Sequence, residues 1–135
     1  NASGPAIART ARDRWTGKGA LADLAGGDPN NITSRMVFDA ADDGDLIAKE
    51  VVDLTIENVA IGLGSLLNVF NPEALVIGGG VVQGLQRHWD RLQQSVIDHS
   101  LPGYGGTIPL TATRLGDDVS LLGAAQLAFR QARRQ

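Results

Sequence analysis

The chain has 135 residues, of which 43% are hydrophobic and 20% are charged, and it carries a formal net charge of −3 with no cysteine. This length suits one domain with a real core, so we expect residues 1–135 to form a single domain. The acidic balance gives no support to direct nucleic-acid binding, and the lack of cysteine excludes disulfides and thiolate metal sites. No apolar run approaches the ~18 residues of a membrane span, so we predict a cytoplasmic protein without a membrane partner.

The first third of the chain predicts two short helices. Ser3 is suited to cap the first helix, with Pro5 in its first turn, and glycines at 17 and 19 end it. The composition of residues 21–31 predicts a loop. Thr33 then caps a second helix, which ends in an acidic turn before Asp45.

Residues 45–70 predict the longest helix. Its first half is amphipathic, whereas residues 59–70 are apolar nearly all round, which predicts full burial of that half. Gly62 and Gly64 each cost up to ~1 kcal/mol in a helix interior relative to alanine. Close packing against a neighbouring backbone would compensate for this cost; a kink or an early helix end are the alternatives.

The next stretch, residues 70–84, predicts a turn, a strand and a glycine run. Residues 74–77 are continuously apolar, as in a strand covered on both faces, and Gly78, Gly79 and Gly80 follow at its carboxyl end. Ligands of open α/β sheets bind at such ends, although a tight connection explains the glycines equally well. A dinucleotide fingerprint would need glycine where the chain has Gln83, and no Walker-type phosphate loop is present.

The remaining residues predict a helix over 85–100, a loop over 101–106, a strand over 107–113 and a last helix over 119–135. Pro109 would require an edge position or a bulge in that strand. Two strands make a thin sheet, so we expect further strands from an upstream segment or a partner chain. His88 and His99 are predicted to be surface helix residues rather than metal ligands, and we predict no metal site.

Four short motifs resemble a known family when their order and spacing are taken together. They are Ser3-Gly4-Pro5-Ala6-Ile7-Ala8, Phe38-Asp39-Ala40-Ala41 with Gly44-Asp45, Asn68-Val69-Phe70-Asn71-Pro72-Glu73 into Val76-Ile77-Gly78-Gly79-Gly80-Val81, and Arg114-Leu115-Gly116-Asp117-Asp118 into Leu122-Gly123-Ala124-Ala125. Together they resemble the C-terminal lobe of the ROK family (repressors, open reading frames and sugar kinases). The resemblance implies an α/β fold of the actin-like, ribonuclease-H-like ATPase class, with an incomplete sheet flanked by helices.

The resemblance also implies a nucleotide site. In the family's kinases ATP lies between two lobes, so Gly78, Gly79 and Gly80 are expected on the adenosine side, with Ser3 and Gly4 near the cleft. Mg²⁺ is expected to accompany ATP in the full-length protein. The family's catalytic aspartate, its sugar-binding histidine and glutamate, and its cysteine-rich zinc motif have no counterpart here. No catalytic residue is therefore predicted in this chain, which we expect to be inactive alone.

Two functions remain open for the parent protein. The first is an ATP-dependent, glucokinase-like hexose kinase, a phosphotransferase whose sugar substrate binds through the missing N-terminal lobe. The second is a sugar-responsive transcriptional repressor, of which this chain would be the effector and dimerisation domain. A homodimer is expected in either case, and a third alternative makes the piece mainly an oligomerisation surface. The start at Asn1-Ala2, without methionine, leads us to expect a fragment of a longer protein.

Overall fold

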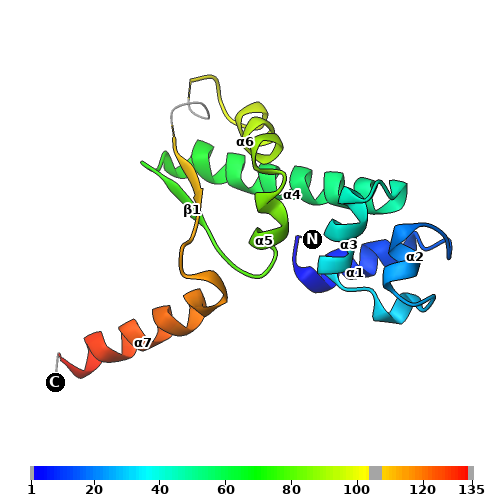
Figure 1. Cartoon of the computed structure of the whole chain (residues 1–135). Coiled ribbons are helices and arrows are strands. Elements are labelled where there is room, and N and C mark those ends of the chain that lie inside the picture. Colours follow the sequence, from blue (N-terminus) through cyan, green and yellow to red (C-terminus); the bar gives the residue numbers. More distant parts are fainter. Residues whose placement is uncertain (1, 104–107, 134–135) are drawn as a thin grey trace.

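The computed structural model describes residues 2–103 and 108–133, which form a helical body, a small sheet and a projecting last helix (Figure 1). The elements in chain order are α1 (Gly4–Asp13), α2 (Ala20–Leu24), the 3₁₀ helix η1 (Pro29–Asn31), α3 (Ser34–Asp42), α4 (Leu46–Phe70), β1 (Leu75–Ile77), α5 (Val82–Gln86), α6 (Trp89–Asp98), β2 (Leu110–Ala112), η2 (Gly116–Asp118) and α7 (Val119–Ala132). Thr107 of the predicted strand, residues 104–106 of the predicted loop and the end of the last predicted helix at 134–135 lie outside the described residues.

Three helix starts follow directly from side-chain caps. Ser3, Thr33 and Asp45 each accept a hydrogen bond from the backbone N–H three residues later, over 3.4, 3.3 and 3.0 Å. The predicted caps Ser3 and Thr33 are confirmed. The second carboxylate oxygen of Asp45 accepts from the N–H of Leu21 at 3.0 Å, so one side chain joins the start of α2 to the start of α4.

Two segments differ from the prediction. Residues 21–31 contain α2 and η1 rather than a plain loop, because Leu21 and Ala25, both 2% exposed, bury apolar surface in the core. The single helix expected over 85–100 is two helices, α5 and α6, which are separated at Arg87 and His88. The residues at the break, Arg87 and His88, include no proline or glycine, so the sequence does not indicate it.

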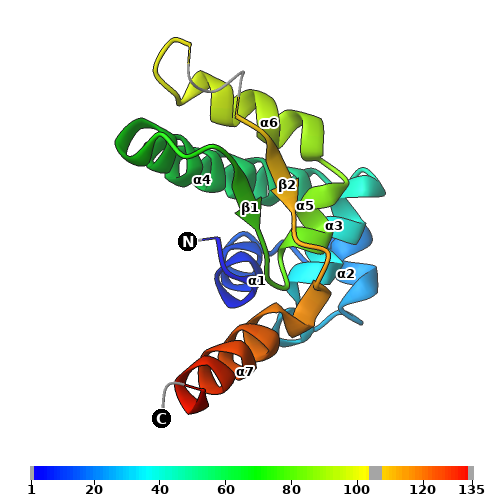
Figure 2. The ribbon, with the colours of Figure 1, turned by 90° about the vertical axis from the view of Figure 1, so that its left-hand side faces the viewer.

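The core lies around α4, which packs against α6 as well as against α3 and α1 (Figure 2). The largest fully buried side chains come from α1, α2, α3, α4 and α6; they are Phe38, Ile7, Leu21, Leu67, Leu92, Val37, Val51 and Val52. None of the described helices is both long enough and apolar enough to cross a membrane.

The two glycines of α4 have different surroundings. A Cβ on Gly64 would stand 2.8 Å from the carbonyl oxygen of His99 and 2.9 Å from its Cβ, so α6 approaches α4 closely at this point. A Cβ on Gly62 would meet nothing within 4 Å. Close backbone packing therefore explains Gly64 and not Gly62, and the helix continues past both to Phe70.

The prediction of complete burial for the second half of α4 and for the first strand is wrong. Val69 is 73% exposed, Phe70 70% and Val76 of β1 65%. The described elements pack against only one side of the second half of α4 and of β1. The apolar residues on the other side, including Val69, Phe70 and Val76, are therefore exposed.

The sheet is a parallel pair of strands in which Leu75 pairs with Leu110 and Ile77 with Ala112. The crossover through α5 and α6 gives this parallel arrangement (Figure 2). Pro109 lies just before β2, where its carbonyl accepts a hydrogen bond from the N–H of Leu75 at 2.9 Å. Because the strands are parallel, both carboxyl ends lie at one edge of the sheet.

Candidate functional site

A pocket of about 420 Å³ opens where the two parallel strands end. Its walls are the glycine turn after β1, one side of α5, and the segment after β2; the lining residues are Gly79, Val82, Gln83, Gln86, Thr113, Arg114 and Gly116. The N–H of Thr113 donates to the carbonyl of Ile77 at 2.8 Å, which extends the ladder by one bond and brings the two loops together. This is the edge at which open α/β sheets bind ligands.

The backbone at the pocket mouth is shaped by glycines. Gly79 has a φ of 113°, a conformation that side-chain-bearing residues rarely adopt, and its carbonyl accepts from the N–H of Val82 at 3.0 Å. A Cβ on Gly79 or Gly80 would meet nothing within 4 Å, so the space above this turn is open. Gly116, with a φ of 57°, turns the chain on the opposite wall. A ligand can therefore approach the main chain from both sides.

The polar groups of the pocket come from two elements. Gln83 and Gln86 extend from α5 and are exposed, as is Arg114 in the segment after β2. The hydroxyl of Thr113 accepts from the N–H of Leu115 at 3.2 Å, which holds this second segment in a turn. The arrangement offers amides, one guanidinium and open main chain to a ligand.

The predicted site residues fall into two groups. Gly79 lines the pocket, and Gly78 and Gly80 are its neighbours in the turn. Ser3 and Gly4 lie at the start of α1, where Ser3 caps the helix and a Cβ on Gly4 would stand 3.1 Å from the Ser34 hydroxyl of α3. Neither belongs to the pocket lining, so their nearness to a nucleotide stays a prediction.

The sequence pattern did not identify the second wall. Thr113, Arg114 and Gly116 follow a strand in the same way as Gly79 does, and the strand-end rule applied to both strands would have found them. The sequence did not predict Gln83 and Gln86 as pocket residues. They line the pocket from the short helix α5, which ends at residue 86, and the sequence does not indicate this helix break.

The α5 wall is held in place by α3. A Cβ on Gly84 would stand 2.6 Å from Cγ of Phe38, so the backbone of α5 lies directly on that ring. The ring of His88 stacks on the ring of Phe38, with centroids 6.1 Å apart and planes inclined by 29°. Phe38 is only 2% exposed, so this contact belongs to the core.

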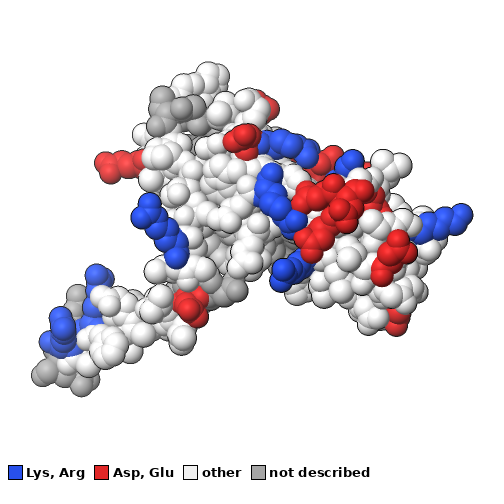
Figure 3. Space-filling view, viewed as in Figure 1, with Lys and Arg blue, Asp and Glu red and all other residues white. Residues whose placement is uncertain are grey.

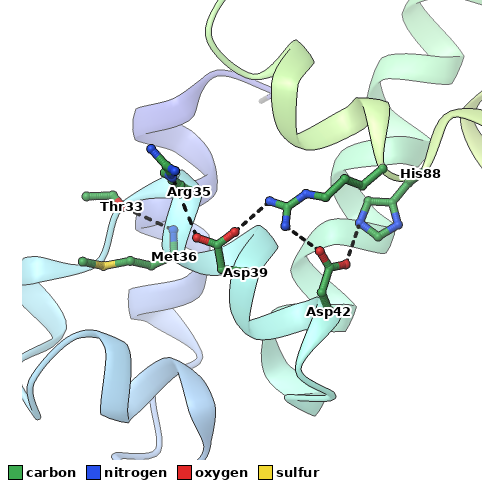
Figure 4. A network of polar contacts seen from close by, with 7 residues as sticks. Thr33, Arg35, Met36, Asp39, Asp42 and His88 are labelled. Atoms are coloured by element: carbon green, nitrogen blue, oxygen red, sulfur yellow. Dashed lines mark hydrogen bonds and ion pairs between the residues drawn. The ribbon is translucent and has the colours of Figure 1, made fainter.

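An ion-pair network reinforces this contact (Figure 4). Arg87 forms ion pairs with Asp39 at 2.9 Å and with Asp42, and Nε2 of His88 lies 3.6 Å from a carboxylate oxygen of Asp42. Figure 3 shows acidic side chains gathered over α3 and the adjoining part of α4, with basic ones beside them. The Arg87 and aspartate side chains are 37–40% exposed, so their pairs orient α5 more than they stabilise it.

The network corrects the prediction for His88. It is not a surface helix residue: its side chain is 16% exposed, it lies at the break between α5 and α6, and its Nε2 makes no hydrogen bond with any described residue. His99, 31% exposed, ends α6, where Nε2 lies 3.0 Å from Glu57 and Nδ1 lies 2.8 Å from the carbonyl of Ser95. The described residues contain no group of three His, Asp or Glu side chains placed to hold a metal ion.

Two other hollows are less suited to a nucleotide. One, of about 280 Å³, lies between the sheet, α4 and α6, with buried Leu67 and Val96 among its lining and Asp90 the only ionisable one of its described lining residues. Another, of about 540 Å³, runs along α4 and α6. It is lined by three carboxylates, those of Glu50, Asp53 and Glu57, and by two guanidiniums, those of Arg14 and Arg91. Arg91 is paired with Asp53 at 2.7 Å. The carboxylates outnumber the guanidiniums there, which disfavours a phosphate, whereas the one charged residue in the described lining of the strand-end pocket is Arg114.

Comparisons with known proteins cover nearly the whole chain. The model of the ROK family matches residues 1–131. A glucokinase of Thermotoga maritima is 32% identical over 101 residues, which are 75% of this chain and 32% of the glucokinase. The DNA-binding transcriptional repressor Mlc of Escherichia coli is 26% identical over 106 residues, which are 78% of this chain and 26% of the repressor.

Among solved structures, a ROK family glucokinase from Streptomyces griseus, in complex with glucose and AMPPNP, superimposes with a TM-score of 0.75 at 27% identity. The match covers 93% of this chain and 42% of that one, so the chain spans less than half the length of the proteins it matches. The predicted actin-like ATPase class is confirmed, and a helix-rich body with a two-stranded parallel sheet is what an incomplete lobe of that fold contains.

Proposed function

The chain belongs to the ROK family, and from this premise we propose that it supplies the adenosine side of the nucleotide site in an ATP-dependent, glucokinase-like hexose kinase. The family resemblance predicted from the four motifs is thereby confirmed. The proposal depends on one observation: the pocket at the carboxyl ends of β1 and β2, with Gly79 on one wall and Arg114 on the other. Glucokinases among the relatives, and AMPPNP in the Streptomyces griseus structure, support it.

The residues present fit an adenosine. The open space over Gly79 and Gly80 lets a base and ribose lie against the main chain. Arg114 offers a planar cation that can cover a base or meet a phosphate, and Gln83 and Gln86 offer amide donors and acceptors. Mg²⁺ prefers carboxylate ligands, and the lining residues whose side chains the structure describes include none. We therefore assign the Mg²⁺ that accompanies ATP to none of the described residues.

The part of this chain in the reaction is positioning. Phosphoryl transfer needs the γ-phosphate held in line with the sugar hydroxyl, and binding the adenosine end fixes where that phosphate can reach. We place neither the catalytic base nor the sugar-binding residues in this chain. We therefore expect the isolated 135-residue chain to phosphorylate no hexose; turnover of any hexose above the blank in a coupled assay would show the proposal of a partial site to be wrong. We also propose that the sugar binds through another lobe, that the protein forms a homodimer, and that it is located in the cytoplasm.

A second candidate is the effector and dimerisation domain of a sugar-responsive repressor. The similarity to the Escherichia coli repressor Mlc supports it. The two candidates differ in what lies upstream in the full-length parent: a phosphate loop and catalytic aspartate favour the kinase, and a basic helix-turn-helix favours the repressor.

The nucleotide role is tested by titrating ATP into the wild type and Gly79→Val. Valine adds a branched side chain at the pocket mouth in a strained conformation, and we expect at least ~10-fold weaker binding, about 1.4 kcal/mol. Gly26→Val is the matched control, since Gly26 also has a positive φ, of 64°, with nothing within 4 Å of a Cβ, but lies outside the pocket. If ATP binds equally to both variants, Gly79 has no place in the site.

A further inference from the structure

The strand-end pocket has an unusual division of polar groups. On the α5 side the groups are the two carboxamides of Gln83 and Gln86, and on the opposite side the guanidinium of Arg114. All three side chains are exposed to solvent. Exposed side chains of this length can turn toward a ligand.

A carboxamide can pair with either purine. Adenine presents an amino donor beside a ring-nitrogen acceptor, whereas guanine presents a carbonyl acceptor beside an N–H donor. A glutamine amide carries an acceptor and a donor side by side, and turning it by half a rotation exchanges them. Gln83 and Gln86 can therefore match both bases.

The exposure of these amides limits how strongly they can discriminate. Sites reject a wrong base by roughly 10⁴-fold or more when the mismatch leaves buried polar groups unpaired. An exposed amide is rehydrated instead, so a mismatch there costs far less. The guanidinium of Arg114 is planar and can lie against the face of a base, and the attraction between a cation and an aromatic face does not depend on the pattern at the edge of the base.

We propose that this pocket accepts purine nucleoside triphosphates of either base, with ATP and GTP affinities within about tenfold of each other. Gln83 and Gln86 pair with the edge of the base, and Arg114 lies against its face. This inference depends on the proposed nucleotide role of the pocket and names the substrate class of that same site.

The test is a calorimetric titration of the 135-residue chain with ATP and then with GTP, each with Mg²⁺. Comparable affinities support the inference, and GTP binding more than about 100-fold weaker than ATP overturns it while leaving the nucleotide site intact. Failure of both nucleotides to bind overturns the proposed function and the inference together. This comparison uses the wild type alone, so it does not depend on the folding of a variant.

Variants then assign the roles. Gln83→Leu combined with Gln86→Leu removes both amides at similar size, and we expect a loss of roughly 3–10-fold for ATP and GTP alike. Arg114→Met should weaken both nucleotides together and leave their ratio unchanged. Gln93→Leu, in α6 outside this pocket, is the matched control and should bind as the wild type does. Unchanged affinities in the double variant, with an unchanged melting temperature, would overturn the role of the amides.

Discussion

Gly64 and Gly62, two residues apart in α4, allow a sharp test of how α4 and α6 pack. An alanine at either position gains the helix propensity that glycine lacks, up to about 1 kcal/mol. At Gly62 nothing opposes this gain, because a Cβ would meet no atom within 4 Å. At Gly64 the Cβ would enter the backbone of His99, whose carbonyl oxygen, Cβ and carbonyl carbon would lie at 2.8, 2.9 and 3.0 Å.

The magnitude at Gly64 follows from this contact. Overpacking costs about 1–3 kcal/mol, and the upper end applies because a backbone cannot turn away as a side chain can. After the helix gain of about 1 kcal/mol, the net destabilisation is about 2 kcal/mol. An alanine at Gly64 would push His99 away from α4 and so strain two contacts of His99. They are the ion pair of its Nε2 with Glu57 at 3.0 Å and the hydrogen bond that its carbonyl accepts from the amide of Asn68 at 3.2 Å.

The measurement is urea unfolding followed by circular dichroism, with the free energy taken from midpoint and slope. We expect Gly62→Ala to raise the free energy of unfolding by up to about 1 kcal/mol and Gly64→Ala to lower it by about 2 kcal/mol, a separation of about 3 kcal/mol. Equal stabilisation by both alanines would refute the close approach of α6 to α4.

Two further predictions concern residues that join elements. Asp45→Ala removes a helix cap and a second backbone acceptor, so we expect the free energy of unfolding in urea to fall by about 1–2 kcal/mol. Asp43→Ala is the control, because Asp43 is exposed in the same turn, and it should change the free energy little. Equal losses in the two variants would contradict the capping role. Gly84→Ala pushes a methyl group into the ring of Phe38 and should lower the free energy of unfolding by about 2 kcal/mol or more. Gly123→Ala in α7 is the control, because a Cβ there would meet nothing within 4 Å, and it should not destabilise the chain. A neutral Gly84→Ala would rule out the packing of α5 on α3.

The sequence was most informative where one side chain decides the local structure. Ser3, Thr33 and Asp45 satisfy backbone N–H groups three residues on, so their caps depend on short-range chemistry alone. The break at Arg87 and His88 depends instead on tertiary contacts, with Asp39, Asp42 and Phe38, which lie 45 or more residues earlier in the chain. No local pattern records such contacts.

Burial and the second wall of the pocket show the same limit. An apolar run such as 59–70 predicts burial but not what covers it, and in this chain Val69 and Phe70 remain exposed. Gly79 was predicted because a glycine run is conspicuous after a strand. Arg114 was not predicted as part of the site, because it becomes one only when β2 pairs in parallel beside β1.

The pocket and the fold are linked through α5. This helix has five residues, too few to be stable by itself, so its position depends on the Gly84–Phe38 packing and on the ion pairs of Arg87. A nucleotide bound between α5 and the segment after β2 binds the folded chain and not the unfolded one. Under the proposed nucleotide role, we therefore expect ATP at a hundred times its Kd to add about 2.7 kcal/mol to the free energy of unfolding. That increment should persist in Gly26→Val and shrink in Gly79→Val, which separates a lost ligand contact from a merely weakened fold.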